Sequence, residues 1–553
     1  MLGIAGYGMW RTRGRRDLNS YLRGGGDSRW FVIGLSVMAT QASAITFLST
    51  PGQGYQDGMG FVQNYFAMPL ALIIIAAVFL PIYRKLNVYT AYEYLGKRFD
   101  GKTRILSASL FLLQRGLGAG ITIYAPAIVL STVLGWSLQW TILCSGLLVI
   151  VYTVAGGSVA VTATQKYQIG IIFAGMIAAF AILMHKMPAA VSFSDAFDLA
   201  GRFHKLKAVD FSVDPKKRYT LWTGLFGGIC LHLSYFGTDQ SQVQRYIGAS
   251  SLREGRLGLM FNAVFKIPMQ FFILLIGSML FVFYQFHQPP VFFNQPAWRK
   301  AVAHDTSGSL RTLEGQFNAA QAQKRELVNR WIDARRAGDS AAQSQLADQA
   351  LAADANTQSI RDHVKSTMHA LDPHVQSNDG DYVFITFILD YLPHGLIGLL
   401  VAVFFAAALA SKSAELNALA STTTVDIYRH IIQSRGDAHY LAASKWFTLF
   451  WGLFALGVAL FAGLMENLIQ ASNIVGSVFY GVVLGLFLVA FFMKWIGGTA
   501  VFCAAVVAQL VVILLYATWD ISYLWYNLIG SAACVGLAML FQLLFRGQTR
   551  VAS

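Results

Sequence analysis

Long apolar stretches separated by short polar segments make up most of the chain between residues 30 and 546. A helix crosses the hydrocarbon layer of a membrane, about 30 Å thick, in about 20 residues. Residues 1–29 supply only a shortened apolar run before a basic cluster. The pattern therefore predicts an all-α polytopic membrane protein with about 13 transmembrane helices, the first one shortened. The full-length candidates lie near 30–49, 61–82, 104–131, 134–153, 158–185, 219–240, 256–286, 394–425, 440–463, 467–492, 497–517 and 521–546.

Composition supports this prediction and excludes several classes of protein. Hydrophobic residues make up 55% of the chain and charged residues 13%, about half the charged fraction of roughly 25% that is usual in soluble proteins. The net charge is +14, but the basic residues gather beside apolar runs. This placement fits the positive-inside rule better than nucleic-acid binding. An ordinary soluble enzyme and a disordered chain are both excluded.

Basic residues also predict the orientation. Arg11 to Arg16 place the start of the chain inside, and most alternate loops are then basic. The loop 186–218 is an exception, since it carries Lys205, Lys207, Lys216, Lys217 and Arg218 on the predicted outer side. We expect a multi-pass protein of a plasma membrane, specifically the bacterial inner membrane, with its C-terminus in the cytoplasm.

The predicted helices fall into two sets of five, over 30–185 and 219–492. Because five is odd, the second set starts from the opposite side of the membrane, as in the inverted repeats of many secondary transporters. Segments 219–286 and 394–492 form the second repeat, and 493–553 add two further helices and a short inner tail. Residues 1–29 form a partial first helix and basic inner segment.

The polar segment 287–393 interrupts the second set. Apolar residues recur with a helical period from Ser309 to Arg336, Gly338 ends that run, and Asp339 or Ser340 can cap a second helix that runs toward Met368. We predict a helical hairpin outside the membrane. It is either a passive cap or spacer, or a partner-binding element. The run 382–391 is expected at the membrane interface.

Several motifs resemble those of the sodium:solute symporter family and follow one another in the family's order. They cover the membrane portion from about residue 30 to 492, and the insert is longer than the loop usual in that family. The motifs are WFVIGLSVMATQASAITFLSTPGQGY (30–55), YAPAIVLSTVLG (124–135), YTVAGGSVAVTATQKYQ (152–168), DQSQVQRYIGA (239–249), ELNALASTTTVDIYRH (415–430) and VGSVFYGVVLGLFL (475–488).

The resemblance implies a sodium site between the first and eighth core helices. Its ligands would be the main-chain carbonyls of Ala39, Ala42 and Ala407 with the hydroxyl of Ser411. A small hard cation prefers such oxygens, and an interrupted helix exposes carbonyls that no longer bond internally. Ala410 replaces a second hydroxyl of the family pattern.

Three residues near this site would modify the coupling. Gln165 stands where relatives commonly carry an aspartate, and Lys166 follows it. Lys412 follows Ser411, and its ammonium group either substitutes for sodium or carries a coupling proton. In the alternative, Lys412 pairs with Glu415 three residues later and Lys166 is an ordinary inner-face anchor.

Solute-binding candidates come from positions that match the family's binding region. Gln41 lies in a predicted break of the first core helix. Tyr235 matches an aromatic residue that covers the solute in a sugar-carrying relative, and Lys266 matches a solute-contacting lysine. His232 lies three residues before Tyr235 on the same helical face, and it is either a packed histidine or a proton relay.

Arg115 stands out without the family pattern. It lies about 11 residues into its helix, near mid-membrane, where an unpaired arginine costs at least about 2.5 kcal/mol. Either Arg115 and Lys266 bind an anion, the guanidinium through a bidentate fork, or Arg115 pairs with an acid on another helix or snorkels.

The positions Tyr65, Met68 and Gly118 lack the hydrogen-bonding groups of the sugar-carrying relative, and this disfavours a neutral hexose. Taken together, these features predict secondary active transport, most simply sodium-coupled symport of a small organic anion by alternating access. A proton-coupled or sodium-independent carrier and a transporter-derived solute sensor are the alternatives. We expect no enzymatic activity, no organic cofactor and no nucleic-acid partner; the solute and the coupling cation are the expected partners.

Overall fold

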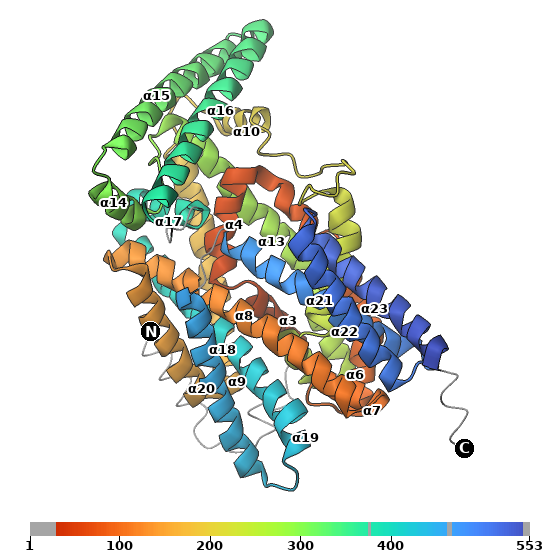
Figure 1. Cartoon of the computed structure of the whole chain (residues 1–553). Helices are drawn as coiled ribbons and strands as arrows, with labels where there is room; N and C mark the ends of the chain where they lie inside the picture. The colour runs from red at the N-terminus through yellow and green to blue at the C-terminus, as the bar shows by residue number, and fades with distance from the viewer. Residues whose placement is uncertain (1–28, 374–377, 462–466, 546–553) are drawn as a thin grey trace.

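The computed structural model describes residues 29–373, 378–461 and 467–545, and omits the side chains of 155–168 and 410. The described residues form helices and no strand, in agreement with the predicted all-α class. The shortened first helix and basic segment of 1–29, and the tail after 545, lie outside this set. Figure 1 shows a bundle of crossing helices from which a long helical hairpin projects.

The first core helix is broken where the sequence predicts a break. Helix α3 (Trp30–Gln41) ends at Gln41, and α4 (Ala44–Asp57) begins three residues later. The Ala42 amide makes the last helical hydrogen bond, to Met38 O at 2.6 Å, and the Thr46 hydroxyl then donates to Gln41 O at 3.2 Å. The carbonyls of the last turn of α3 therefore face the break instead of a continuing helix.

A second break lies within the predicted helix 219–240, and the sequence did not predict it. Helix α11 (Gly228–Gly237) ends before Thr238, and α12 (Gln240–Ile247) continues the chain. The Asp239 carboxylate caps α12 by accepting from the Ser241 amide at 2.9 Å. Each broken helix is the first helix of one of the two predicted five-helix sets.

Long helices surround the two breaks. Helix α13 (Leu252–Phe286) packs against α3 and α4, while α18 (His394–Thr422) packs against α8 (Gly101–Leu134). Helix α21 (Leu468–Phe492) packs against both α8 and α11. Helix α20 (Asp437–Phe461) packs against α8 and α9.

Eight helical segments in the described part of the chain are long and apolar enough to cross a membrane, and three shorter apolar segments accompany them. One predicted boundary is wrong. Helix α9 runs without interruption over Leu138–His185, where two helices, 134–153 and 158–185, were expected. The junction contains Gly156 and Gly157 but no proline. Each glycine weakens a helix by only about 1 kcal/mol and does not remove a backbone donor.

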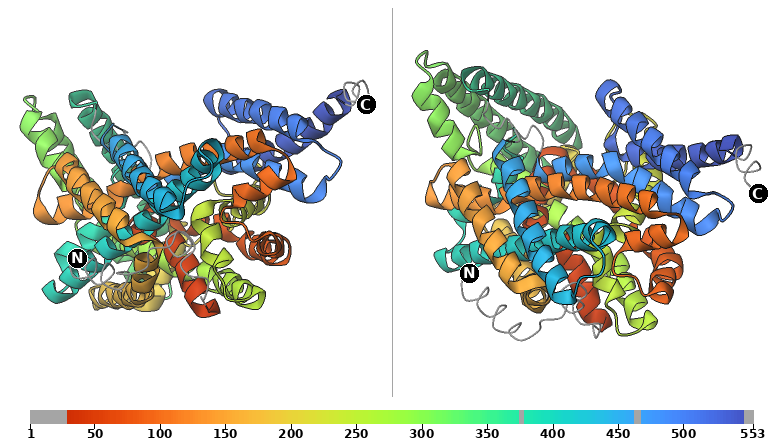
Figure 2. Two further views of the ribbon diagram at one scale, coloured as in Figure 1. Left: turned by 90° about the horizontal axis from the view of Figure 1, so that it is seen from below. Right: turned by 60° about the horizontal axis from the view of Figure 1, so that its bottom comes forward.

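The insert forms the predicted hairpin. Helix α15 (Ser309–Arg336) and α16 (Ser340–Leu371) pack together, Gly338 adopts a left-handed φ of 74°, and Asp339 caps α16 through the Ala342 amide at 2.9 Å. Helix α14 (Gln295–His304) precedes the pair. Figure 2 shows the hairpin and the C-terminal helices α22 (Gly498–Thr518) and α23 (Tyr523–Phe545) on opposite sides of the bundle.

Two short helices lie outside the predicted transmembrane segments. The run 382–391 lies in α17 (Gly380–Tyr391), which packs against α4 and is buried along most of its length, so it is a core element of the protein. The loop 186–218 contains α10 (Phe193–Arg202). Arg335 at the end of α15 forms ion pairs with Asp195, at 3.3 Å, and with Asp198 of α10, and these contacts connect the hairpin to the loop.

Candidate functional site

A cavity of about 100 Å³ lies where the broken helices meet α8, α18 and α21. Four of the five predicted solute-binding residues line it: Gln41, Arg115, His232 and Tyr235. Lys266 is fully buried beside the cavity, with its ammonium nitrogen 5.6 Å from the ring centre of the lining residue Tyr65. The fold thus brings together side chains from five helices that the sequence places far apart.

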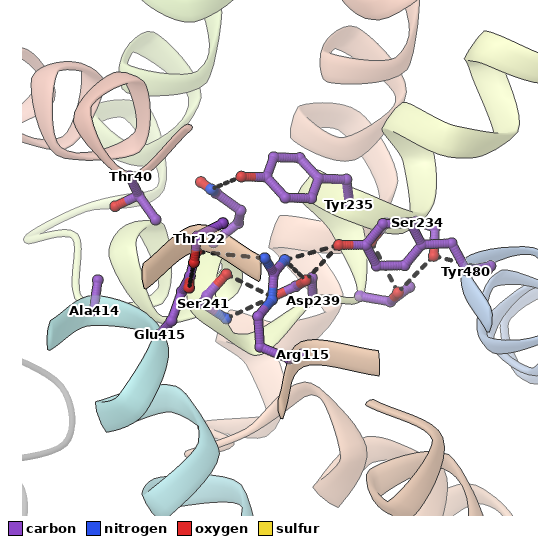
Figure 3. A network of polar contacts seen from close by, with 12 residues as sticks. Thr40, Arg115, Thr122, Ser234, Tyr235, Asp239, Ser241, Ala414, Glu415 and Tyr480 are labelled. Atoms are coloured by element: carbon purple, nitrogen blue, oxygen red, sulfur yellow. Dashed lines mark hydrogen bonds and ion pairs between the residues drawn. The ribbon is translucent and has the colours of Figure 1, made fainter. Parts of the chain in front are cut away.

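A network of buried charges forms one wall of the cavity (Figure 3). The guanidinium of Arg115 in α8 forms an ion pair with Asp239 at the α11–α12 break and donates to the Tyr480 hydroxyl at 2.7 Å. A second carboxylate, that of Glu415 in α18, lies 3.6 Å from the same guanidinium. Of the two explanations offered by the sequence, pairing with an acid on another helix is the arrangement seen here.

The Asp239 carboxylate receives further hydrogen bonds. The Tyr480 hydroxyl donates to it at 2.8 Å, and the Ser241 hydroxyl donates at 2.6 Å. Asp239 therefore joins α8, α12 and α21, because its partners come from all three helices. Each group is nearly excluded from solvent, and such charges are retained inside a membrane protein only with close partners.

Lys412 joins the same network. Its ammonium group forms an ion pair with Glu415 at 2.6 Å and donates to the Thr122 hydroxyl. This is the i, i+3 pair that the sequence offered as the alternative to a role in coupling. Glu415 thus lies between two cations, Arg115 and Lys412, and faces the cavity.

His232 and Tyr65 also line the cavity, and Lys266 lies next to Tyr65. His232 Nε2 lies 2.8 Å from Asn64 O, and its ring stacks on Tyr65 with centres 5.9 Å apart. These contacts are those of a packed, hydrogen-bonded histidine. Among the described residues, the Lys266 ammonium has no hydrogen-bonding partner. A buried lysine of this kind is costly without an anion or a water molecule nearby.

Gln41 and Tyr235 complete the predicted set. Gln41 ends α3, and its side-chain oxygen is buried without a hydrogen-bond donor in the described part of the molecule. The Tyr235 hydroxyl accepts from Gln242 at 2.7 Å, while the Arg115 guanidinium lies 5.5 Å from the centre of its ring. Tyr235 therefore contacts the charge network through its ring and α12 through its hydroxyl.

The predicted sodium ligands lie near the same break. Ala39, Ala42, Ala407 and Ser411 are all buried. The Ser411 hydroxyl is directed at α3 and lies 3.4 Å from Thr40 O. Main-chain carbonyls and one hydroxyl are the oxygen donors that a hard cation prefers, so the chemistry of this junction fits sodium.

Neighbouring positions have other surroundings. Ser413 faces away from the break, and its hydroxyl lies 2.5 Å from that of Thr153 in α9. It therefore does not replace the hydroxyl that Ala410 lacks. The side chains of Gln165, Lys166 and Ala410 are outside the described set, and their predicted roles remain predictions.

Sequence reasoning did not select Asp239, Glu415 or Tyr480 for the site. A signal was present, because Asp239 and Glu415 begin two of the quoted motifs and acidic residues within apolar segments are rare. An arginine at mid-membrane needs such a partner. What the sequence lacks is the pairing itself, since Asp239 lies 124 residues from Arg115.

Comparison with known proteins gives a consistent result. The model of the sodium:solute symporter family matches residues 21–309 and 368–508. The human sodium-coupled monocarboxylate transporter 1 is 28% identical over 476 residues, covering 86% of this chain and 64% of that protein. The human sodium/iodide cotransporter is 30% identical over 289 residues, covering 51% and 44%. The aligned region thus spans less than two thirds of these relatives.

A solved structure shares the fold. An outward-open, substrate-bound Na⁺-coupled sialic acid symporter superposes with a TM-score of 0.72 at 23% identity, covering 98% of this chain and 96% of that one. The family match itself leaves out most of the hairpin, between residues 309 and 368. The matched regions cover most of the chain, and the protein belongs to the sodium:solute symporter family.

Proposed function

We propose that this protein is a sodium-coupled symporter of a small organic anion. One observation carries the choice of an anion: the Lys266 ammonium group is buried beside the central cavity without a hydrogen-bond partner among the described residues, whereas the charged residues that line the cavity, Arg115 and Glu415, balance each other. A solute carboxylate would supply the missing negative charge. The names of the relatives support this choice, since they include a monocarboxylate and an iodide transporter.

The size of the cavity supports a small solute. Its volume of about 100 Å³ is below the range of about 300–1,000 Å³ typical of sites for drug-sized ligands, which favours a small solute. The polar lining residues, among them Gln41, Asn64 and Asn473, would orient such a solute beside the cations.

Coupling to sodium follows from the position of the α3 break. A cation held by the carbonyls of Ala39, Ala42 and Ala407 and by Ser411 would lie near the solute cavity, since Thr40 and Gln41 border both. A cation and an anion bound together have little net charge, so their passage through a low-dielectric interior costs less than the passage of either alone. Entry of each positive charge also gains about 2.3 kcal/mol per 100 mV of membrane potential.

Alternating access would use the two broken helices. The cation would stabilise the state open to the outside, the solute would bind next to it, and the two five-helix sets would then rock to open the inner side. The location in a bacterial inner membrane and the cytoplasmic C-terminus belong to this proposal. A proton-coupled carrier remains the alternative that the test below separates.

The test uses purified protein in proteoliposomes and radiolabelled acetate, propionate and pyruvate. Uptake is expected to require an inward sodium gradient and to stop when choline replaces sodium. Lys266→Met removes the charge without leaving a carboxylate unpaired, and we expect uptake at low solute concentration to fall about tenfold or more, since a bond to a charged group contributes roughly 1.5–3 kcal/mol. Lys494→Met, an exposed lysine, is the matched control.

Two results would contradict the proposal. Equal uptake by Lys266→Met and Lys494→Met would remove the argument for an anion at this cavity. Uptake that persists without sodium but follows a pH gradient would favour the proton-coupled alternative.

A further inference from the structure

A second and larger cavity lies between the hairpin and the membrane core. Its volume is about 530 Å³, within the range of about 300–1,000 Å³ typical of small-molecule sites. The end of α4, the end of α13, the loop after α10 and the facing sides of α15 and α16 form its walls. A hydrogen bond from Gln321 to Tyr284 O, at 2.8 Å, ties the hairpin to α13 at its edge. The cavity is thus built mainly by the segment that the family match omits.

Four cations and two carboxylates line this cavity, namely Lys205, Lys324, Arg361, Lys365, Asp57 and Asp354. The lining therefore has an excess of two positive charges. Some of the charges are already paired: Lys324 contacts Asp354 at 3.0 Å, and Lys365 lies 3.8 Å from Asp379. These pairs leave two cations, Lys205 and Arg361, and one lining carboxylate, Asp57, so one positive charge is not balanced.

Neither Lys205 nor Arg361 forms an ion pair within the described part of the chain. Lys205 donates to Gln56 O at 2.6 Å, and Arg361 donates to Pro290 O at 2.7 Å. Aromatic rings flank both: Lys205 Nζ lies 4.4 Å from the centre of Phe281, and the Arg361 guanidinium lies 5.5 Å from that of Phe317. Both cations therefore keep donors available for an anion, and Arg361 does so while 7% exposed.

Two buried polar atoms in the same lining lack partners. The Tyr284 hydroxyl and the Gln285 side-chain oxygen form no hydrogen bond with any described residue, although both side chains are only 1% exposed. Such groups cost free energy unless a ligand or water satisfies them. Burial also lowers the pKa of Lys205 and of Lys324, which is the condition that a bound anion relieves.

We propose that this cavity binds an organic anion with an aromatic or apolar body and a hydrogen-bond donor. Its charged group meets Lys205 and Arg361, and its body lies against Tyr55, Phe281 and Phe317. Its donor and acceptor groups satisfy Gln285 and Tyr284. The site is separate from the central cavity, and its occupancy does not depend on the proposed transport.

The experiment measures equilibrium binding of radiolabelled 4-hydroxybenzoate to the purified full chain in lipid nanodiscs, with no ion gradient. The neutral amide of the same compound tests the need for charge. Lys205→Gln removes a cation that donates to a main-chain carbonyl, and Tyr284→Phe removes a hydroxyl without a partner among the described residues, so neither leaves a buried charge unpaired. Lys300→Gln, an exposed lysine on α14 that is outside the cavity lining, is the matched control.

We expect saturable binding of the anion, at least tenfold weaker binding of the amide, and at least tenfold weaker binding to Lys205→Gln. Tyr284→Phe should weaken binding severalfold, and it tests the site independently if Lys205→Gln disturbs the packing of the hairpin. The affinity of Lys300→Gln should stay within twofold of that of the unaltered protein. The absence of saturable binding, which would mean water alone fills the cavity, overturns the proposal. So does equal binding of acid and amide, or binding that Lys266→Met abolishes and that neither Lys205→Gln nor Tyr284→Phe changes.

Discussion

The ion pair between Arg115 and Asp239 allows a quantitative test of how the charge network holds the two halves of the molecule together. Arg115→Met removes the cation and leaves Asp239, which is 1% exposed, without its strongest partner. Removing one member of a buried pair costs about 3–5 kcal/mol. The hydrogen bonds from Tyr480 and Ser241 to Asp239 remain and reduce this penalty. We therefore expect a loss near 3 kcal/mol.

The reverse change is expected to cost less. Asp239→Asn leaves Arg115 with the Glu415 carboxylate 3.6 Å away, so the guanidinium keeps a counter-ion. We expect a loss of about 1–2 kcal/mol, comparable to one hydrogen bond to a charged group. The double variant removes both charges, and its loss should be smaller than the sum of the two single losses by at least about 1 kcal/mol.

The free energy of unfolding of each variant is measured by titrating detergent-solubilised protein with sodium dodecyl sulfate and following helix content by circular dichroism. Lys494→Met, an exposed lysine outside the network, sets the scale for an uninvolved charge. If the loss of the double variant equals the sum of the two single losses to within about 0.5 kcal/mol, Arg115 and Asp239 are not coupled. A larger loss for Asp239→Asn than for Arg115→Met would refute the role assigned to Glu415.

Three further predictions follow from local contacts. Asp339→Ala removes the cap of α16 and should cost the hairpin about 1 kcal/mol, seen as faster amide hydrogen exchange in the hairpin; an unchanged protection pattern would contradict it. Ser411→Ala should raise the sodium concentration for half-maximal uptake several-fold with little change in solute affinity, measured in proteoliposomes, and no change would remove Ser411 from the proposed sodium site. Although desolvation raises the pKa of Asp195, hydrogen bonds from Ser192 and the charge of Arg335 bring it below its ordinary value. The contact between α10 and α15 should therefore be complete at about pH 6 and be lost as the pH falls toward about 3, with faster hydrogen exchange in α10, whereas equal exchange at both values would contradict this.

The sequence alone predicted the features that are encoded by residues close together along the chain. The length of an apolar run, the period of Ser309 to Arg336, the stop at Gly338 and the cap at Asp339 are all encoded within one or two helical turns, and the structure contains them at those positions. The predicted interruption between 153 and 158 is wrong, because the helix continues through it. Local propensity is weak there, and neither outcome is strongly favoured.

Only the tertiary structure decided which charges meet. The sequence shows that Arg115 at mid-membrane needs a partner, because an unpaired charge in lipid is costly whatever the fold. It does not show that Asp239 and Glu415 supply the carboxylates, since these residues come from separate helices whose packing fixes the distances. The larger cavity depends on packing in the same way: its walls come from segments far apart in the sequence, and Lys205 and Arg361 line it together only after the hairpin packs on α4 and α13.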